Sequence, residues 1–425
     1  MTSAPFCRRA CLAILLGGLA LAVPASAIGQ LLPPLSGTID RTLGAARDTL
    51  EPVDRTLDDA RTLARAQVER GRDLIRRHPG RIALDPDGHA VRAGEVTVID
   101  ADPPMIAAAA QRGFRLIEQV MLEELGVGYA RFEAPRGMAI GRALRRMRDI
   151  AGGREVSADP LHFTSGMLAA NAPAAPVVAP AGRRDGQRIG IVDGGVGPGT
   201  PGLASQRGFA RGGPRAQDHA SAIASLLTGG GGVRASAGGG ALYVADVYGD
   251  DPAGGNATAI ARAIAWLVGE RVPVVVISLV GPPNPLLARV VAAARGRGTL
   301  VVAAVGNDGP AAPPAYPASY PQAIAVTGVD GRGRPLIEAG RARRIDYAAP
   351  AADMLALDAA GRARTVRGTS FAAPFVAARI SAHLAAGETG GDMARALAAV
   401  DREARPGGPR TGRGILCAGC RTPPR

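Results

Sequence analysis

Lysine is absent from this sequence of 425 residues, so apart from five histidines every basic side chain is an arginine. Aromatic residues are also scarce, at 3% of the chain. A formal net charge of +13 often marks a protein that binds nucleic acid. Here the arginines are scattered among Ala, Gly and Pro, and few rings are available to stack on bases. We therefore expect no nucleic-acid partner.

Cysteine is limited to four residues, with Cys7 and Cys11 near the N-terminus and Cys417 and Cys420 near the C-terminus. The C-A-G-C pair offers two ligands, whereas a structural zinc site needs four. A local disulfide or a free thiol pair is therefore favoured over metal, and we predict no metal site.

Long apolar runs are missing except at the start of the chain. Arg8 and Arg9 precede the apolar run Ala10–Val23, and the small-residue triplet A-S-A ends at Ala27. This pattern predicts a signal peptide over residues 1–27. An uncleaved anchor is the alternative, but the run is shorter than the roughly 20 residues of a spanning helix. We expect a secreted protein, extracellular or periplasmic, with no stable membrane span after cleavage.

After the signal peptide, the composition distinguishes three regions that precede the large C-terminal domain. Residues 28–94 are Arg-rich and predict a helical leader. Residues 95–163 follow the order strand, helix, strand, strand, helix, strand, which predicts a small α+β domain of the βαββαβ type. An Ala/Pro-rich linker is expected over residues 164–186.

Residues 187–425 alternate continuous apolar strands with helical runs. Such strands are buried on both faces, which predicts a three-layer α/β domain with a mostly parallel central sheet. Ligands of these sheets bind at the carboxyl ends of the strands, so polar residues at those positions are the candidate site residues.

Four polar residues occupy such positions, in the order Asp193, His219, Asn307, Ser370. Each has an ordinary structural interpretation taken alone: a turn-capping Asp, a structural His, an Asn in a left-handed turn, and a Ser that caps a helix. Together they provide a nucleophile, a base, a group that orients the base, and an amide donor for an oxyanion. The combination favours acyl-transfer chemistry.

The search for a base among the histidines leaves only His219 in the large domain. His383 follows Ser370 by thirteen residues on the same predicted helix, which places it about 20 Å along the axis, outside hydrogen-bonding reach.

The segments around these four residues resemble the signature segments of subtilisin-like serine proteases. The most specific is G-T-S-F-A-A-P at Ser370, followed by A-A-V-G-N-D-G at Asn307, and D-Y-A-A-P resembles the segment that precedes the serine motif. The order Asp, His, Ser is also that of the subtilase family. The resemblance extends from about Gln187 to Ala418.

The resemblance implies a secreted serine endopeptidase that hydrolyses polypeptides through an acyl-enzyme. Asp193, His219 and Ser370 would form the triad, and Asn307 would bind the oxyanion. It also implies a set of substrate-binding residues, namely Ser278, Leu279, Val280, Gly281, Ala303, Ala304, Val305 and Gly306. The chemistry requires no cofactor, and we find no carboxylate cluster to assign to the structural calcium that related enzymes often carry.

The small domain resembles the pro-region of many subtilases, which assists folding and blocks the active site. This implies a self-processed precursor in which the domain acts as an intramolecular inhibitor, with cleavage near Phe163–Thr164. A permanent accessory domain is the alternative.

The chain departs from the family pattern at three places. His219-Ala220-Ser221-Ala222 stands where His-Gly-Thr-His is usual, Phe375 stands where a His often follows the Pro, and Val280 replaces a common Gly. Val280 adds bulk where substrate is expected to lie, so subsite preference is open. A noncatalytic binding protein with this fold, and an esterase with the same triad, are the alternative functions.

Overall fold

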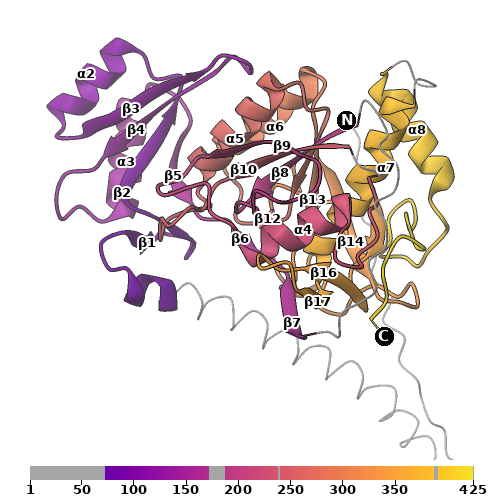
Figure 1. Cartoon of the computed structure of the whole chain (residues 1–425). Coiled ribbons are helices and arrows are strands. Elements are labelled where there is room, and N and C mark those ends of the chain that lie inside the picture. The colour runs from indigo at the N-terminus through magenta and orange to yellow at the C-terminus, as the bar shows by residue number, and fades with distance from the viewer. Residues whose placement is uncertain (1–71, 172–186, 238–239, 387–390, 425) are drawn as a thin grey trace, which may run out of the picture. The chain divides into compact units, whose positions relative to one another are not determined.

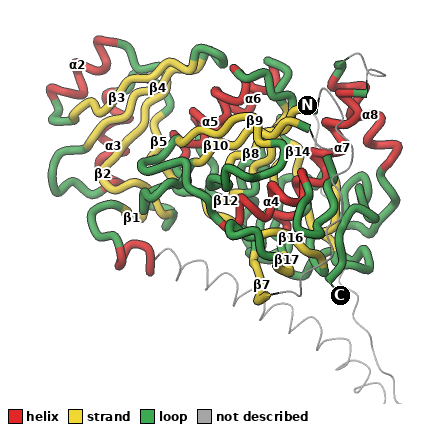
Figure 2. Tube along the Cα trace, viewed as in Figure 1, coloured by secondary structure: helices red, strands yellow, loops and turns green. Residues whose placement is uncertain are grey.

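The computed structural model describes residues 72–171, 187–237, 240–386 and 391–424 of the chain. The predicted signal peptide and residues 28–71 of the predicted helical leader lie outside the described residues. The centre of the large domain is a parallel sheet of seven strands in the order β15-β14-β13-β11-β8-β10-β9 (Figures 1 and 2). Its strands are β8 (Arg188–Asp193), β9 (Leu203–Gly208), β10 (Ala241–Asp246), β11 (Val274–Ile277), β13 (Leu300–Ala304), β14 (Ile324–Val329) and β15 (Tyr347–Pro350).

Two helical layers cover the sheet because its strands carry apolar residues on both faces. In β11, Val274 and Val276 belong to one core, while Val275 and Ile277 belong to the other, as the two-residue period of a strand dictates. The first core includes residues of α4 (Asp218–Thr228), α7 (Ala373–Ala385) and α8 (Met393–Glu403). The second includes residues of α5 (Ala257–Gly269) and α6 (Pro285–Gly296). The predicted three-layer α/β fold is confirmed.

The small domain is an antiparallel sheet packed on two helices. Its elements are β1 (Ile82–Leu84), β2 (Ala90–Ile99), α2 (Pro103–Gln111), β3 (Arg115–Leu122), β4 (Val127–Glu133), α3 (Ile140–Ile150) and β5 (Val156–Pro160). The strand order is β1-β2-β4-β3, with β5 paired to β2. The predicted order of strands and helices from residue 95 onward is confirmed.

The predicted start of this domain at residue 95 is too late, because β1 and the first half of β2 lie in the stretch that we expected to be a helical leader. The pairing of β2 with β5 shifts register between Val91 and Val96, and Gly94 lies there at φ +69°. Such a bulge interrupts the alternation of apolar and polar residues by which a strand is identified in a sequence.

The predicted linker over residues 164–186 is also wrong at its N-terminal end. β6 (Phe163–Thr164) pairs with β12 (Leu279–Val280), and β7 (Met167–Asn171) pairs with β17 (Ala363–Arg367) of a hairpin completed by β16 (Met354–Leu357). These partners lie more than a hundred residues away in the sequence, so local composition could not reveal the pairing. The remainder, 172–186, lies outside the described residues.

A buried carboxylate joins the small domain to the start of α5. Asp159 is fully buried and accepts hydrogen bonds from the backbone N–H of Thr258, at 3.0 Å, and from its hydroxyl, at 2.7 Å. The guanidinium of Arg92 lies 3.7 Å from the same carboxylate. A negative charge at the N-terminus of a helix is also favourable for the helix dipole.

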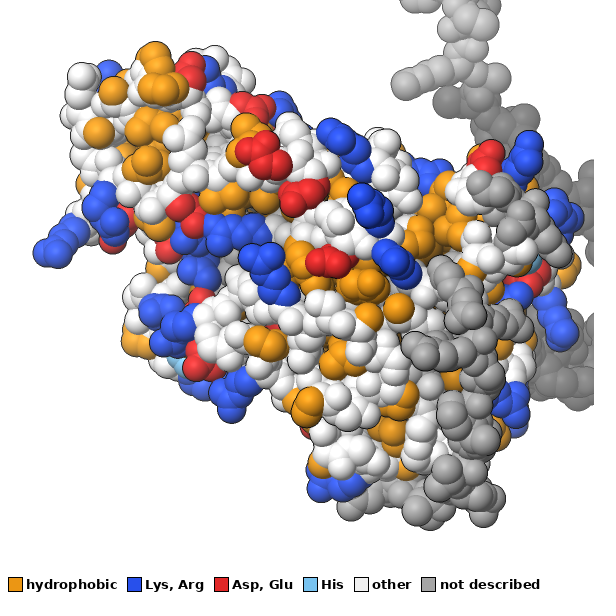
Figure 3. All heavy atoms as spheres, turned by 45° about the horizontal axis from the view of Figure 1, so that its top comes forward, with side chains coloured by type: hydrophobic (Ala, Val, Ile, Leu, Met, Phe, Trp, Pro, Cys, Tyr) orange, Lys and Arg blue, Asp and Glu red, His pale blue; other side chains and the backbone are white. Residues whose placement is uncertain are grey.

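The surface of the described residues carries mixed charge. Figure 3 shows arginines interspersed with Asp and Glu side chains. Many of these are paired, as in Arg289 with Asp100 and Glu155. At the other end of the chain, Cys417 and Cys420 form a disulfide. No helix among the described residues is long and apolar enough to cross a membrane.

Removal of the Asp159 carboxylate by Asp159→Ala is expected to lower the free energy of unfolding of the full-length chain by about 3 kcal/mol, because it leaves buried donors without partners. Urea unfolding in a Ser370→Ala background measures the change. The exposed Asp149 gives the matched control, Asp149→Ala, for which we expect a change within about 0.5 kcal/mol. Equal losses in both variants would contradict the prediction.

Candidate active site

The four candidate residues lie at one edge of the parallel sheet. Asp193 ends β8, and Asn307 follows the end of β13 by three residues. His219 is the second residue of α4, and Ser370 lies in a short 3₁₀ turn, Thr369–Phe371, that leads into α7. Carboxyl ends of parallel strands meet at the same edge, which is why residues so far apart in sequence converge.

The carboxylate of Asp193 holds the imidazole of His219. Asp193 Oδ2 lies 2.9 Å from His219 Nδ1, and Asp193 Oδ1 accepts the backbone N–H of Gly194 at 2.8 Å. Both side chains are buried. The other ring nitrogen, His219 Nε2, is buried and has no hydrogen-bond partner among the described residues. With Nδ1–H donated to Asp193, Nε2 is left as a free proton acceptor.

Ser370 does not cap a helix. The residue that caps α7 is Ala372, which has no side-chain capping bond, and Pro374 occupies the first turn. The hydroxyl of Ser370 instead lies 2.7 Å from the hydroxyl of Ser165 and donates to the carbonyl of Ser278 at 3.2 Å. The structural interpretation of Ser370 as an N-cap is therefore wrong, and its side chain faces the sheet edge.

The amide of Asn307 is oriented by the turn that carries Ser370. Its Oδ1 accepts the backbone N–H of Thr369 at 3.0 Å, which leaves Nδ2 to face Gly368. A Cβ on Gly368 would lie 2.7 Å from Asn307 Nδ2 and 3.0 Å from the carbonyl oxygen of Ser165. The amide donor and that carbonyl oxygen thus border the same small space, and only a glycine leaves the space open.

A segment of the chain itself passes through the site as an extended strand. On one side β6 pairs with β12, with Thr164 opposite Leu279 and Phe163 opposite Val280. On the other side β7 pairs with β17, with Met167 opposite Arg367. The bond between Ser165 and Gly166 lies between these pairings, beside Ser370 and Asn307. A Cβ on Gly166 would also lie 3.3 Å from His219 Nε2.

The predicted substrate-binding residues divide into two groups. Ser278, Leu279, Val280 and Gly281 lie along the strand that pairs with β6, and Ser278 Oγ donates to the carbonyl of Ser370 at 2.8 Å. The side chains of Ala303, Ala304 and Val305 are fully buried in the two cores, as is that of Leu279. Gly306, which follows these three residues, lies against the side chain of Val280.

Ser165, Gly166 and Phe371 were not identified from the sequence, although each borders the reactive groups. The ring of Phe371 lies 5.6 Å from that of His219, centroid to centroid. The G-T-S-F motif contained Phe371, but nothing in it indicated contact with the base. Ser165 and Gly166 lay in an expected linker, so no sequence signal placed them.

His162 anchors the same segment two residues before Thr164. Its backbone N–H donates to Gly255 at 2.7 Å, and its carbonyl accepts the hydroxyl of Tyr248 at 2.7 Å. The ring is fully buried against Gly281, and neither ring nitrogen has a partner among the described residues. Burial lowers the pKa of His162 to about 4, so the ring is neutral at pH 7.

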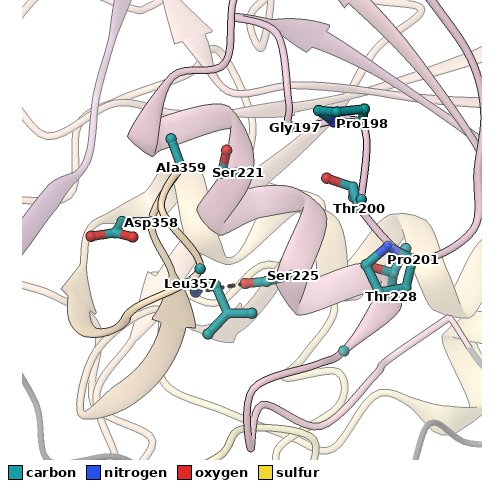
Figure 4. Close-up of a pocket in the computed structure, with 13 residues that line it drawn as sticks. Gly197, Pro198, Thr200, Pro201, Ser221, Ser225, Thr228, Leu357, Asp358 and Ala359 are labelled. Atoms are coloured by element: carbon teal, nitrogen blue, oxygen red, sulfur yellow. Dashed lines mark hydrogen bonds between the residues drawn. The ribbon is translucent and has the colours of Figure 1, made fainter.

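A hollow of about 310 Å³ lies beside α4. Figure 4 shows Ser221, Ser225 and Thr228 of α4 across from Thr200 and Pro201, with the turn Leu357–Ala359 beside them. Ser221, part of the divergent His-Ala-Ser-Ala segment, has a buried hydroxyl without a hydrogen-bond partner there. The hollow contains none of the four candidate residues.

One cluster of potential metal ligands occurs among the described residues, formed by Asp85, Asp87 and His89 in the turn between β1 and β2. Asp85 Oδ1 accepts the backbone N–H groups of Asp87 and His89, so this carboxylate organises the turn. It lies in the small domain and takes no part in the site.

Comparison with known proteins agrees with this geometry. The model of the subtilase family matches residues 184–389. Subtilisin BL of Lederbergia lenta is 31% identical over 201 residues, which cover 45% of this chain and 74% of that protein. Subtilisin Savinase of the same organism is 30% identical with the same coverage.

Solved structures show the same fold at lower identity. Fervidolysin of Fervidobacterium pennivorans, described as a keratinolytic enzyme related to subtilisin, has a TM-score of 0.64 and 16% identity, and the match covers 80% of this chain and 63% of that one. The epidermin leader peptide processing serine protease of Staphylococcus aureus has a TM-score of 0.60 and 14% identity over 77% of this chain and 97% of that one. The sequence and structural matches, together with the order and placement of the four residues, show that this chain belongs to the subtilase family of serine peptidases.

Proposed function

We propose that the protein is a secreted serine endopeptidase with an Asp193–His219–Ser370 triad, made as a precursor that cleaves itself. The observation that carries the proposal is the extended segment in the cleft, which presents the Ser165–Gly166 bond to Ser370 as a substrate would. The N-terminal signal pattern supports export to the periplasm or the exterior.

The reaction begins when the hydroxyl of Ser370 leaves Ser165 and turns toward His219 Nε2, which has no other partner among the described residues. Ser370 Oγ attacks the carbonyl carbon as its proton passes to Nε2, and the Asp193 carboxylate stabilises the imidazolium. The proton then goes to the leaving amine, and an acyl-enzyme remains. Water hydrolyses this ester by the same route, with no cofactor required.

The oxyanion of the tetrahedral intermediate would be bound by Asn307 Nδ2 and the backbone N–H of Ser370. The bond from Thr369 to Asn307 Oδ1 fixes the amide before substrate arrives, so little reorganisation is needed in the transition state.

Strand pairing on both sides of the reacting bond favours an endopeptidase. β12 holds the residues on the acyl side, and β17 holds those on the leaving side as far as Asn171. A small ester would use neither strand, and a noncatalytic binding protein would not need the free Nε2 of His219. Labelling of Ser370 by a fluorophosphonate probe separates the peptidase from a noncatalytic module.

The small domain would serve as an intramolecular inhibitor, since its last strand leads directly into the cleft. The geometry favours cleavage at the Ser165–Gly166 bond, two bonds after the Phe163–Thr164 bond near which the sequence predicts cleavage. After cleavage, the residues up to Ser165 would stay paired with β12 and block the acyl side.

Ser370→Ala is expected to give a folded chain that remains full length and has lost hydrolysis by about 10⁶-fold, the size of effect measured when the nucleophile is removed from a related enzyme. Intact mass and casein turnover measure the two effects. A Ser370→Ala chain that is cleaved between Ser165 and Gly166 in the absence of other proteases would contradict the proposal.

Asn307→Ala removes the side-chain donor to the oxyanion. We expect kcat to fall by about 10²–10³ with KM changed by only a few-fold, because the donor acts in the transition state and not on the bound substrate. This magnitude comes from a member of the same family. Steady-state kinetics on a peptide substrate test it, and a loss confined to KM would rule out the oxyanion role.

Acidification is expected to weaken the docking of the segment that carries His162. The ring has a pKa of about 4 when buried and near 6.5 when exposed, so the unfolded chain binds more protons as the pH falls from 6.5 to 4. The stability that the neutral ring supports is therefore present above pH 6.5 and is lost on the way down, by about 2 kcal/mol at pH 5.

Urea unfolding of Ser370→Ala precursors at pH 7 and pH 5 measures this loss. His162→Gln is expected to reduce the difference between the two pH values. The partly exposed His78 provides the control, since His78→Gln should leave the difference as it is. An unchanged pH dependence in His162→Gln would disprove the assignment.

A further inference from the structure

We propose that Val280 and Phe371 restrict this peptidase to bonds between a small residue and a glycine. The inference rests on the proposed peptidase function and adds its substrate class. Val280 limits the residue whose carbonyl is attacked, and Phe371 limits the residue that leaves with the amine.

On the acyl side, the space beside Ser165 is closed by Val280. The register that places Phe163 opposite Val280 and Thr164 opposite Leu279 puts Ser165 next to Ser278. A longer side chain at position 165 would extend between β12 and the segment of Gly306 and Asn307 on the other wall. Val280 fills this gap, because its Cγ1 lies 3.1 Å from the point where a Cβ on Gly306 would be.

The side chain found at position 165 fits this closed space. Val280 is only 6% exposed and packs in the wall of the cleft. The Ser165 hydroxyl turns onto Ser370 instead of entering a pocket. Gly, Ala and Ser are the side chains that need no additional room there.

On the leaving side, the ring of Phe371 prevents any side chain at position 166. A Cβ on Gly166 would lie 2.6 Å from Cε2 and 2.9 Å from Cζ of Phe371, both closer than real contacts allow. Phe371 is fully buried, and its ring packs on that of His219. The ring therefore cannot move aside without disturbing the base.

Position 163 is not restricted in this way. Phe163 is 36% exposed, so its side chain can extend away from the cleft while its backbone pairs with Val280. The limits set by Val280 and Phe371 thus act on the two residues of the reacting bond and not on position 163.

Compensating substitutions in the precursor test the acyl side. Ser165→Phe is expected to slow self-cleavage by about 100-fold or more, and Ser165→Ala by no more than a few-fold. Adding Val280→Gly to the Ser165→Phe chain should raise its rate of self-cleavage by at least 10-fold. The matched control is Phe163→Ser, which exchanges the same residue types at an exposed position and should change the rate by only a few-fold.

The leaving side is tested in the same way. Gly166→Leu should slow cleavage by about 100-fold or more, and Phe371→Ala in the Gly166→Leu chain should raise the rate relative to Gly166→Leu alone. Absence of rescue in both pairs would overturn the assignment of Val280 and Phe371.

Peptides that copy residues 162–168 provide a test that needs no variant protein. The processed wild-type enzyme is expected to favour Ser-Gly and Ala-Gly peptides over Phe-Gly and Ser-Leu peptides by about 100-fold in kcat/KM. Equal turnover of all four would overturn the restriction while leaving the peptidase function intact. Absence of fluorophosphonate labelling and of any cleavage would instead overturn the proposed function and this inference with it.

Discussion

Burial of the parallel sheet on both faces is the constraint on which the rest of this structure depends. Alternate residues of each central strand enter separate cores, under α4 and α7 on one face and under α5 and α6 on the other. In the central strands β8, β11 and β13 the interior residues are apolar or glycine, so polar side chains occur only at or beyond the strand ends, and the parallel direction brings the carboxyl ends to one edge. Asp193 and Asn307 reach the site by this route, and His219 and Ser370 come to it from the turns that start the covering helices.

Strand addition extends this edge into a groove that the proposed function assigns to the substrate. β12 and β17 lie on either side of Ser370, and their backbones pair with residues 163–164 and 167–171 of the same chain. Backbone pairing recognises any extended chain, so it supplies binding without selecting a sequence. Selection then has to come from the side chains that border the reacting bond. Val280 and Phe371 are the large apolar residues at that position, which explains why a segment with Ser165 and Gly166 fits.

The residues just before this segment would link folding to the proposed control of activity. Asp159 and His162 are buried at the junction between the small domain and the catalytic domain, one bonded to Thr258 and the other without a ring partner among the described residues. A buried carboxylate with satisfied hydrogen bonds stabilises the junction, whereas a buried neutral imidazole makes its stability depend on pH. In the proposed precursor, the Asp159 contact would hold the two domains together at any pH near neutral, and the His162 contact would weaken in acid.

The sequence by itself determined the alternation of strands and helices, the order of the small domain from residue 95, and the four polar residues at strand and helix ends, because periodicity and turn chemistry are local properties. It did not determine the strand pairing of residues 163–171, the bulge at Gly94 that hid the start of β2, or the three-residue offset between Ser370 and the start of α7. It also could not show that Ala303, Ala304 and Val305 point into the cores, or that Phe371 touches His219 and Gly166. These features depend on contacts between segments far apart in the chain, and only the tertiary structure brings such segments within reach of one another.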